Sequence, residues 1–206
     1  MSADIRICFI GDSLVNGAGD TSNLGWVGRV CAAANQFGFR VTAYNLGIRR
    51  ETSGDIAQRW RQECRLRQPV EADNRMVFAF GINDTTIEDH HCRVEPLDSV
   101  ANARATMSEA QTLGPVLWVG PTPVEEADQN QRIDKLDHAY AELANELTVP
   151  YLSVFESLNT TGPWLDELRT GDGSHPGQDG YVQLAGLVKQ WPAWWFHQTI
   201  TQGLEL

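Results

Sequence analysis

Short apolar runs alternate with longer amphipathic stretches along the chain. Each apolar run is too short for a helix and is bounded by glycine, asparagine, proline or polar residues, which is typical of a strand. We predict strands at residues 5–10, 41–45, 76–80, 116–119 and 151–154. The stretches between them predict helices at residues 26–36, 54–65, 97–112 and 129–147. A last helix is predicted after Pro176, where Tyr181, Leu184, Val188 and Trp191 form one apolar stripe.

Nearly continuous apolar strands that alternate with helices indicate a parallel sheet covered on both faces. The sequence therefore predicts an α/β fold, a three-layer α/β/α sandwich of flavodoxin-like type with a five-stranded parallel sheet. Counting the predicted strands along the chain, we expect the order 2-1-3-4-5, in a single domain over residues 1–206. In such sheets, ligands bind beyond the carboxyl ends of the strands.

Four polar motifs stand where these strands end. Gly11-Asp12-Ser13-Leu14 follows the first strand, and Asn45-Leu46-Gly47-Ile48-Arg49-Arg50 follows the second. Gly81-Ile82-Asn83-Asp84 follows the third, and Asp172-Gly173-Ser174-His175-Pro176 lies between the fifth strand and the last helix. The first three strands are neighbours in the predicted order, so their motifs are expected to converge at one edge.

Together and in this order, the motifs resemble those of the GDSL, or SGNH, hydrolase family of esterases and lipases. The resemblance runs from Gly11 to Pro176. It implies that Ser13 is the nucleophile and His175 the general base. It further implies that Asp172 orients His175 and that Asn83 donates a hydrogen bond to the oxyanion.

The chemistry of these residue types agrees with that assignment. A serine hydroxyl needs a base to take its proton, and a neutral imidazole is suited to this near neutral pH. Asp172 precedes His175 by three residues, so one turn of chain brings its carboxylate to the imidazole. The backbone N–H of Ser13 and the side-chain amide of Asn83 would bind the oxyanion. The alternative for Ser13 is a helix N-cap or turn residue.

The second motif departs from the family pattern. Many members read N-x-G-x-x-G, and the second glycine supplies an oxyanion-hole N–H, but here that position is Arg50. The N–H persists if the backbone angles suit a non-glycine residue. Arg49 and Arg50 are also candidates for binding a carboxylate or phosphate of the substrate; the alternative is ion pairing with Glu51 or Asp55.

The composition argues against several classes of binding partner. The chain carries 16 Lys and Arg against 27 Asp and Glu, a net charge of −11, which argues against nucleic acid and anionic membrane surfaces. The four cysteines are spread without a metal-binding spacing, and the proposed chemistry needs neither cofactor nor metal. No secretion signal is recognised, so a cytoplasmic protein without stable membrane insertion is expected.

Substrate and assembly are less defined by the sequence. Residues 155–170, with Trp164, and residues 85–95 are expected to wall the acyl pocket. Packing on the end of the sheet, a homo-oligomer contact or a lipid-facing patch would explain the C-terminal aromatic residues Trp191, Trp194, Trp195 and Phe196. We expect a serine esterase acting on a small-molecule ester or thioester, with small-acyl or lysophospholipid-like substrates. A carbohydrate O-acetyl esterase, an acyltransferase and a flavodoxin-like binding module without catalysis are the alternatives.

Overall fold

The computed structural model describes residues 4–197, and in them five parallel strands form the central sheet. Its spatial order is β2-β1-β3-β6-β7, which is the predicted order 2-1-3-4-5 once the strands outside this sheet are left uncounted. The strands are β1 (Asp4–Gly11), β2 (Arg40–Gly47), β3 (Asp73–Ala79), β6 (Val116–Val119) and β7 (Tyr151–Leu152). The predicted fold class is therefore confirmed.

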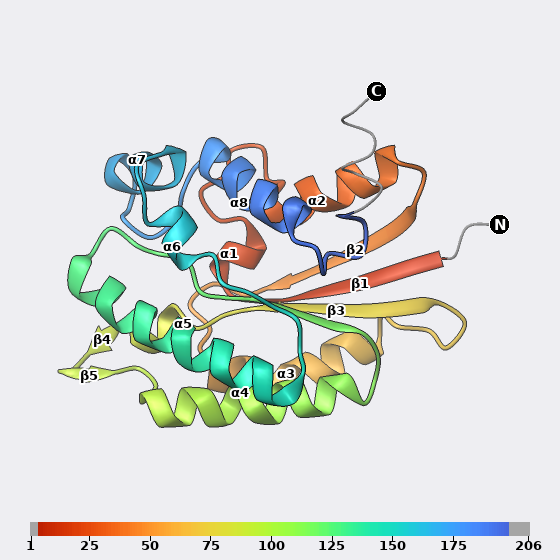
Figure 1. The fold of residues 1–206 in the computed structure, drawn as a ribbon, viewed down its shortest axis with the longest axis horizontal. Helices are drawn as coiled ribbons and strands as arrows, with labels where there is room; N and C mark the ends of the chain where they lie inside the picture. Colours follow the sequence, from red (N-terminus) through yellow and green to blue (C-terminus); the bar gives the residue numbers. More distant parts are fainter. Residues whose placement is uncertain (1–3, 198–206) are drawn as a thin grey trace.

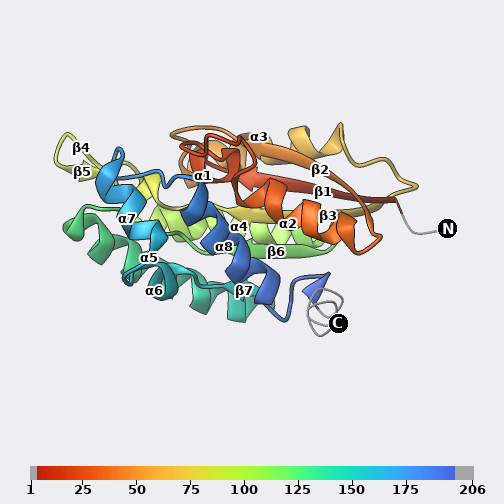
Figure 2. The same cartoon turned by 90° about the horizontal axis from the view of Figure 1, so that it is seen from above.

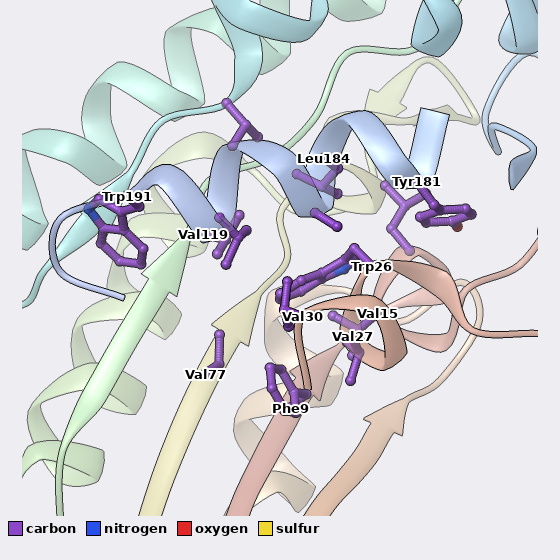
Figure 3. Packing of buried hydrophobic residues seen from close by; sticks show 14 of the residues in the cluster. Phe9, Val15, Trp26, Val27, Val30, Val77, Val119, Tyr181, Leu184 and Trp191 are labelled. Carbon is purple, nitrogen blue, oxygen red and sulfur yellow. The ribbon is translucent and has the colours of Figure 1, made fainter. Parts of the chain in front are cut away.

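Helices cover both faces of the sheet (Figures 1 and 2). One face carries α2 (Gly25–Gln36) and α8 (Gln178–Gln190), together with the short helices α1 (Ser13–Asn16), α6 (Phe155–Leu158) and α7 (Pro163–Thr170). The other face carries α3 (Ser53–Arg65), α4 (Pro96–Gln111) and α5 (Ala127–Leu147). Side chains alternate along β1, so that Phe9 packs under α2 and α8 (Figure 3) while Ile10 packs toward α3.

A small hairpin of β4 (Ile87–Glu88) and β5 (His91–Cys92) follows the 3-10 turn η1 (Asn83–Thr85). The sequence pattern did not predict it. Asp89 and His90 adopt positive φ angles of 50° and 67°, the backbone that a tight two-residue hairpin turn requires. The hairpin projects beyond the carboxyl edge of the sheet (Figure 1).

The C-terminal aromatic residues pack against their own chain. Trp194 and Phe196 are buried in the core with residues of α2 and α8, and the ring of Phe196 packs on that of Phe39 at a tilt of 52°, with ring centroids 4.7 Å apart. The guanidinium of Arg75 lies 5.0 Å from the ring of Trp195. Packing against the sheet, one of the three expectations for this segment, is what the structure shows, while the oligomer contact and the lipid-facing patch stay predictions. Within residues 4–197, no helix is both long and apolar enough to cross a membrane.

Asp84 joins the third motif to the helices on its face of the sheet. It is 1% exposed; one carboxylate oxygen accepts the backbone N–H of Ser53 at 2.8 Å, and the other accepts the hydroxyl of Ser99, which also contacts Tyr140. Burial raises the pKa of Asp84, and the hydrogen bonds from Ser53 and Ser99 oppose that rise. Asp84 thus has the structural role that suits a buried turn residue.

This bridge predicts different outcomes for two substitutions. Asp84→Ala leaves the Ser53 N–H and the Ser99 hydroxyl without their buried acceptor and should lower the free energy of unfolding by about 1–3 kcal/mol. Asp84→Asn keeps an acceptor for Ser53 and donates to Ser99, so the loss should be smaller. Urea unfolding of both variants measures the difference, and equal losses would contradict the assigned bridge.

Candidate active site

Ser13 stands at the turn between β1 and α1. The carboxylate of Asp12 caps this helical turn by accepting the backbone N–H of Leu14 at 2.9 Å. The carbonyl of Ser13 accepts the N–H of Gly17 at 3.0 Å, and Gly17 ends the turn with a left-handed φ of 87°. Ser13 is therefore both the first residue of a helix and, with 7% of its surface exposed, at the floor of a cavity.

The side chains of Ser13, His175 and Asp172 form a continuous hydrogen-bonded series. His175 Nε2 lies 2.8 Å from Ser13 Oγ, and His175 Nδ1 lies 2.7 Å from Asp172 Oδ2. Ser13 and His175 are 162 positions apart in the sequence. The structure thus brings together the three residues that the sequence motifs single out.

Asp172 is held in its position by the loop that contains it. Its Oδ1 accepts the backbone N–H groups of Ser174 at 3.0 Å and His175 at 2.8 Å. Burial raises the pKa of Asp172, but the hydrogen bonds from the His175 ring and these two N–H groups outweigh that effect and bring the pKa to about 2. The carboxylate is consequently charged at neutral pH and orients the imidazole.

A second contact sets the distance between Ser13 and His175. The loop after α1 passes against the His175 loop at Gly19, whose φ is 92°, and a Cβ there would lie 2.4 Å from the carbonyl oxygen of Pro176. The hydroxyl of Tyr181, on α8, donates to the carbonyl of Ala18 at 2.8 Å. Glycine at position 19 therefore permits a close backbone approach, and Tyr181 fastens it.

Asn83 and Arg50 border the same cavity from the third and second motifs. Asn83 Nδ2 donates one hydrogen to the carbonyl of Glu51 at 2.9 Å, which leaves its second hydrogen available. Arg50 has a left-handed φ of 69°. This conformation favours glycine, the residue of the family pattern at this position. Its backbone N–H has no acceptor among the described residues.

Arg59, on the charge-rich helix α3, lies beneath these motifs. Its Nη2 donates to the carbonyls of Gly11 at 3.2 Å and Leu46 at 2.8 Å, and its Nε donates to the carboxylate of Glu51 at 2.6 Å. One side chain from α3 thus joins the ends of β1 and β2 to the loop that holds Asn83. It lies on the helix that follows the second motif, but the sequence gives no sign that its side chain reaches back beneath the strand ends.

The cavity above Ser13 has a volume of about 340 Å³. Thr86, Glu88 and Arg93, from the predicted wall at residues 85–95, line it, and Gln129 is a lining residue that the sequence did not indicate. Residues 155–170 do not line it.

The sequence prediction that Trp164 binds the substrate is wrong. Its side chain is fully buried, and its indole N–H donates to the carbonyl of Pro123 at 3.0 Å. An indole packed in this way presents no surface to a ligand. The tryptophan in a long connection is part of the core that carries α7.

The two arginines of the second motif differ in their partners. Arg50 pairs with Glu88 at 2.9 Å. The expected partners are engaged elsewhere, because Glu51 pairs with Arg59 and Asp55 caps α3 together with Thr52. Arg49 is exposed and has no ion pair or hydrogen bond among residues 4–197.

Within residues 4–197, no group of three or more His, Cys, Asp or Glu side chains converges so as to hold a metal ion. The run Asp89-His90-His91-Cys92 forms the turn and second strand of the hairpin. There its side chains are exposed or half-buried.

Comparison with known proteins gives one family and one fold. Residues 9–183 match the GDSL-like lipase/acylhydrolase family, whereas a search of curated proteins finds no match. A lipase/acylhydrolase from Enterococcus faecalis is similar in structure, with a TM-score of 0.75, 23% identity, and coverage of 91% of this chain and 93% of its own. A catalytic mutant of an acetylxylan esterase from Geobacillus stearothermophilus has a TM-score of 0.76, 19% identity, and coverage of 93% and 95%. At these identities the structural likeness shows a shared fold.

Asp12 makes the stability of the folded chain depend on pH. Burial raises its pKa to about 7, the hydrogen bond from Leu14 opposes the rise, and the charge of Asp84 adds to it. An unfolded aspartate loses its proton near pH 4, so between about pH 4 and about pH 7 the folded chain binds one more proton. The contribution of protonated Asp12 to the free energy of unfolding is fully present below about pH 4 and is lost as the pH rises through about 7.

Asp12→Asn keeps the cap on Leu14 and removes this titration. Its free energy of unfolding relative to the wild type should therefore rise with pH, by at most about 1.4 kcal/mol per unit. Urea unfolding at about pH 5 and about pH 8 measures it. For Asp20, burial is outweighed by hydrogen bonds from Arg29 and Ser22 that lower its pKa; Asp20→Asn is the control, and its difference should be constant over that range. A constant difference for Asp12→Asn as well would contradict the prediction.

Proposed function

The chain belongs to the GDSL-like lipase/acylhydrolase family, and on that premise we propose that this carboxylic ester hydrolase acts through an acyl-serine intermediate on Ser13. The observation that carries the proposal is the series in which Ser13 Oγ lies 2.8 Å from His175 Nε2 and His175 Nδ1 lies 2.7 Å from Asp172. A binding module without catalysis would need Ser13 and His175 out of mutual reach, and that condition is not met.

In the first half of the reaction, Ser13 Oγ attacks the carbonyl carbon of the ester or thioester while its proton passes to His175 Nε2. The carbonyl electron pair moves to oxygen and forms a tetrahedral oxyanion. When this intermediate collapses, the bond to the alcohol or thiol breaks, and His175 gives its proton to the leaving atom. The acyl group stays on Ser13.

In the second half, water takes the place of the alcohol. His175 Nε2 accepts a proton from the water, the resulting hydroxide attacks the acyl-Ser13 carbonyl, and the proton returns to Ser13 Oγ as the acid leaves. In an acyltransferase, the alternative activity, a second alcohol would replace the water.

Asp172 would serve both halves by stabilising the imidazolium of His175. Its low pKa, about 2, keeps it charged when the proton resides on His175. The matched acetylxylan esterase gives independent support, because structures of its catalytic mutants carry an exchanged serine, aspartate or histidine. In that enzyme the aspartate and histidine are three positions apart, as Asp172 and His175 are.

Three N–H groups would stabilise the oxyanion: the backbone N–H of Ser13, the backbone N–H of Arg50 and the second hydrogen of Asn83 Nδ2. The Glu51 carbonyl holds the Asn83 amide in place. Such preorganised donors act on charge that develops only during attack, and each is typically worth about 10²–10³ in kcat.

The lining of the cavity favours a small acyl group and a polar alcohol. Leu14 and Ile82 supply the aliphatic side chains that face it, and charged or polar residues supply most of the rest. A long acyl chain would find little apolar surface there, which disfavours a lysophospholipid-like substrate. The same observation supports a carbohydrate O-acetyl esterase as the second candidate, and acetylxylan esterases are among the matched structures.

A fluorophosphonate probe tests the nucleophile. It should label the wild type at Ser13, and Ser13→Ala should not be labelled, because within residues 4–197 no other hydroxyl forms a hydrogen bond with His175 Nε2. Mass spectrometry of the labelled peptide distinguishes Ser13 from Ser174, which lines the same cavity. Circular dichroism checks that the variant is folded; equal labelling of a folded Ser13→Ala would overturn the assignment.

A series of p-nitrophenyl esters tests the acyl pocket. We expect kcat/KM to be highest for acyl chains of about two to four carbons and to fall at least tenfold by about eight carbons, since each further buried CH₂ needs apolar surface that the cavity lacks. Rates that rise toward eight carbons would instead support the lysophospholipase alternative. Added alcohols that divert the acyl group from water would favour the acyltransferase.

A further inference from the structure

Arg49 stands where two hollows meet. The cavity above Ser13 adjoins a second hollow of about 530 Å³, and the two share Arg49, Asp172 and His175 as lining residues. The second hollow is otherwise formed largely by the loops on either side of His175, with Glu167 and Thr170 at its rim. A ligand that reaches into both hollows can therefore contact Arg49.

The charge of Arg49 is not compensated, whereas its neighbours are paired. Arg50 and Arg93 both face Glu88, at 2.9 Å and 3.5 Å. In the second hollow, the carboxylate of Glu167 accepts the N–H groups of Asp179 and Gly180 at the start of α8. Asp172 is held by His175. Arg49 itself makes no ion pair or hydrogen bond within residues 4–197.

The chemistry of ester cleavage places the alcohol half of the substrate on this side. His175 Nε2 must give its proton to the departing oxygen, so that oxygen lies against the imidazole. The acyl carbonyl oxygen would face the proposed oxyanion donors instead, which include the Asn83 amide and the Arg50 N–H. His175 also lines the second hollow, and Arg49 lines both hollows without an ion pair among residues 4–197.

We propose that Arg49 binds an anionic group, a carboxylate or a phosphate, on the alcohol half of the substrate. The inference rests on the proposed function and adds a substrate class to it: small-acyl esters of anionic alcohols. A guanidinium presents paired N–H donors that match both oxyanions. Because the chain as a whole has a net charge of −11, its surface repels anions, and an unpaired arginine is what would bring one to this point.

Matched acetyl esters test the site in the whole protein. Para-acetoxybenzoate and para-acetoxyphenyl phosphate carry the anion on the alcohol half, the methyl ester of para-acetoxybenzoate is the neutral counterpart, and monophenyl succinate carries its anion on the acyl half. For Arg49→Gln, kcat/KM for the two anionic acetates should fall about tenfold through KM, the loss expected for one charge-assisted contact. Hydrolysis of the neutral ester should stay within about twofold.

Arg65→Gln is the control for net charge. Arg65 is an exposed arginine at the end of α3, and it lines neither hollow. The variant should hydrolyse all four esters as the wild type does. Raising the salt concentration should lower the wild-type preference for anionic esters and leave Arg49→Gln unaffected, since an exposed charge is screened within about 10 Å at 0.1 M.

The results separate the two levels of the proposal. Equal losses on neutral and anionic acetates, or a wild type that does not prefer the anion, would overturn the role of Arg49 while hydrolysis of the neutral ester still supports the esterase. A selective loss on monophenyl succinate would place the anion on the acyl half and also overturn it. If no ester is hydrolysed, the proposed function fails. Calorimetric binding of para-hydroxybenzoate, weakened in Arg49→Gln and unchanged in Arg65→Gln, then still supports the anion site, and equal binding refutes it.

Discussion

At the carboxyl edge of the sheet, the backbone of β1 packs against its neighbours without side chains between them. A Cβ on Gly11 would lie 2.0 Å from the carbonyl oxygen of Ala79, and a Cβ on Gly47 would lie 2.2 Å from the amide nitrogen of Asn16. Contacts this short exclude every residue but glycine. The chain leaves β1 directly into the turn of Ser13, so this approach sets the position of the serine relative to β2 and β3. The arrangement of the loops around Ser13 depends on it.

Close backbone packing leaves strand-end carbonyls that need donors, and Arg59 supplies them. Its guanidinium reaches the carbonyls of Gly11 and Leu46, and its pairing with Glu51 neutralises its charge. A buried arginine without such a partner would be costly. The Glu51 backbone in turn holds the amide of Asn83. The β1 turn, the second motif and the third motif are therefore connected through one side chain, and the oxyanion donors stand on a single braced unit.

The fold and the convergence of the first three motifs could be predicted because they follow from local rules, whereas the grouping of Ser13 with His175 and Asp172 was implied by the resemblance to the GDSL family. Apolar strands that alternate with helices along the chain predict a parallel sheet, and the carboxyl ends of parallel strands lie at one edge. The roles of Trp164 and Arg59 could not be predicted, because a tryptophan or an arginine in isolation does not reveal which side of its element is buried. Trp164 was expected to wall the pocket because it lies in a long connection, but it is part of the core. Arg59 lies on a helix rich in charged residues, yet its guanidinium binds backbone carbonyls in the interior. Both depend on tertiary contacts that composition does not encode.

Arg50 shows how the departure from the family pattern is accommodated. A left-handed φ of 69° costs a residue with a Cβ about 1–2 kcal/mol, so the loop needs contacts that glycine would not require. Arg93 donates to the Arg50 carbonyl at 2.8 Å, and the Arg50 side chain pairs with Glu88 on β4. The same two arginines and one glutamate thus join the second motif to the hairpin that walls the cavity. Glu88 is committed to Arg50 and Arg93, and within residues 4–197 Arg49 has no ion-pair partner, so the positive charge between the two hollows is left by the way this loop is held.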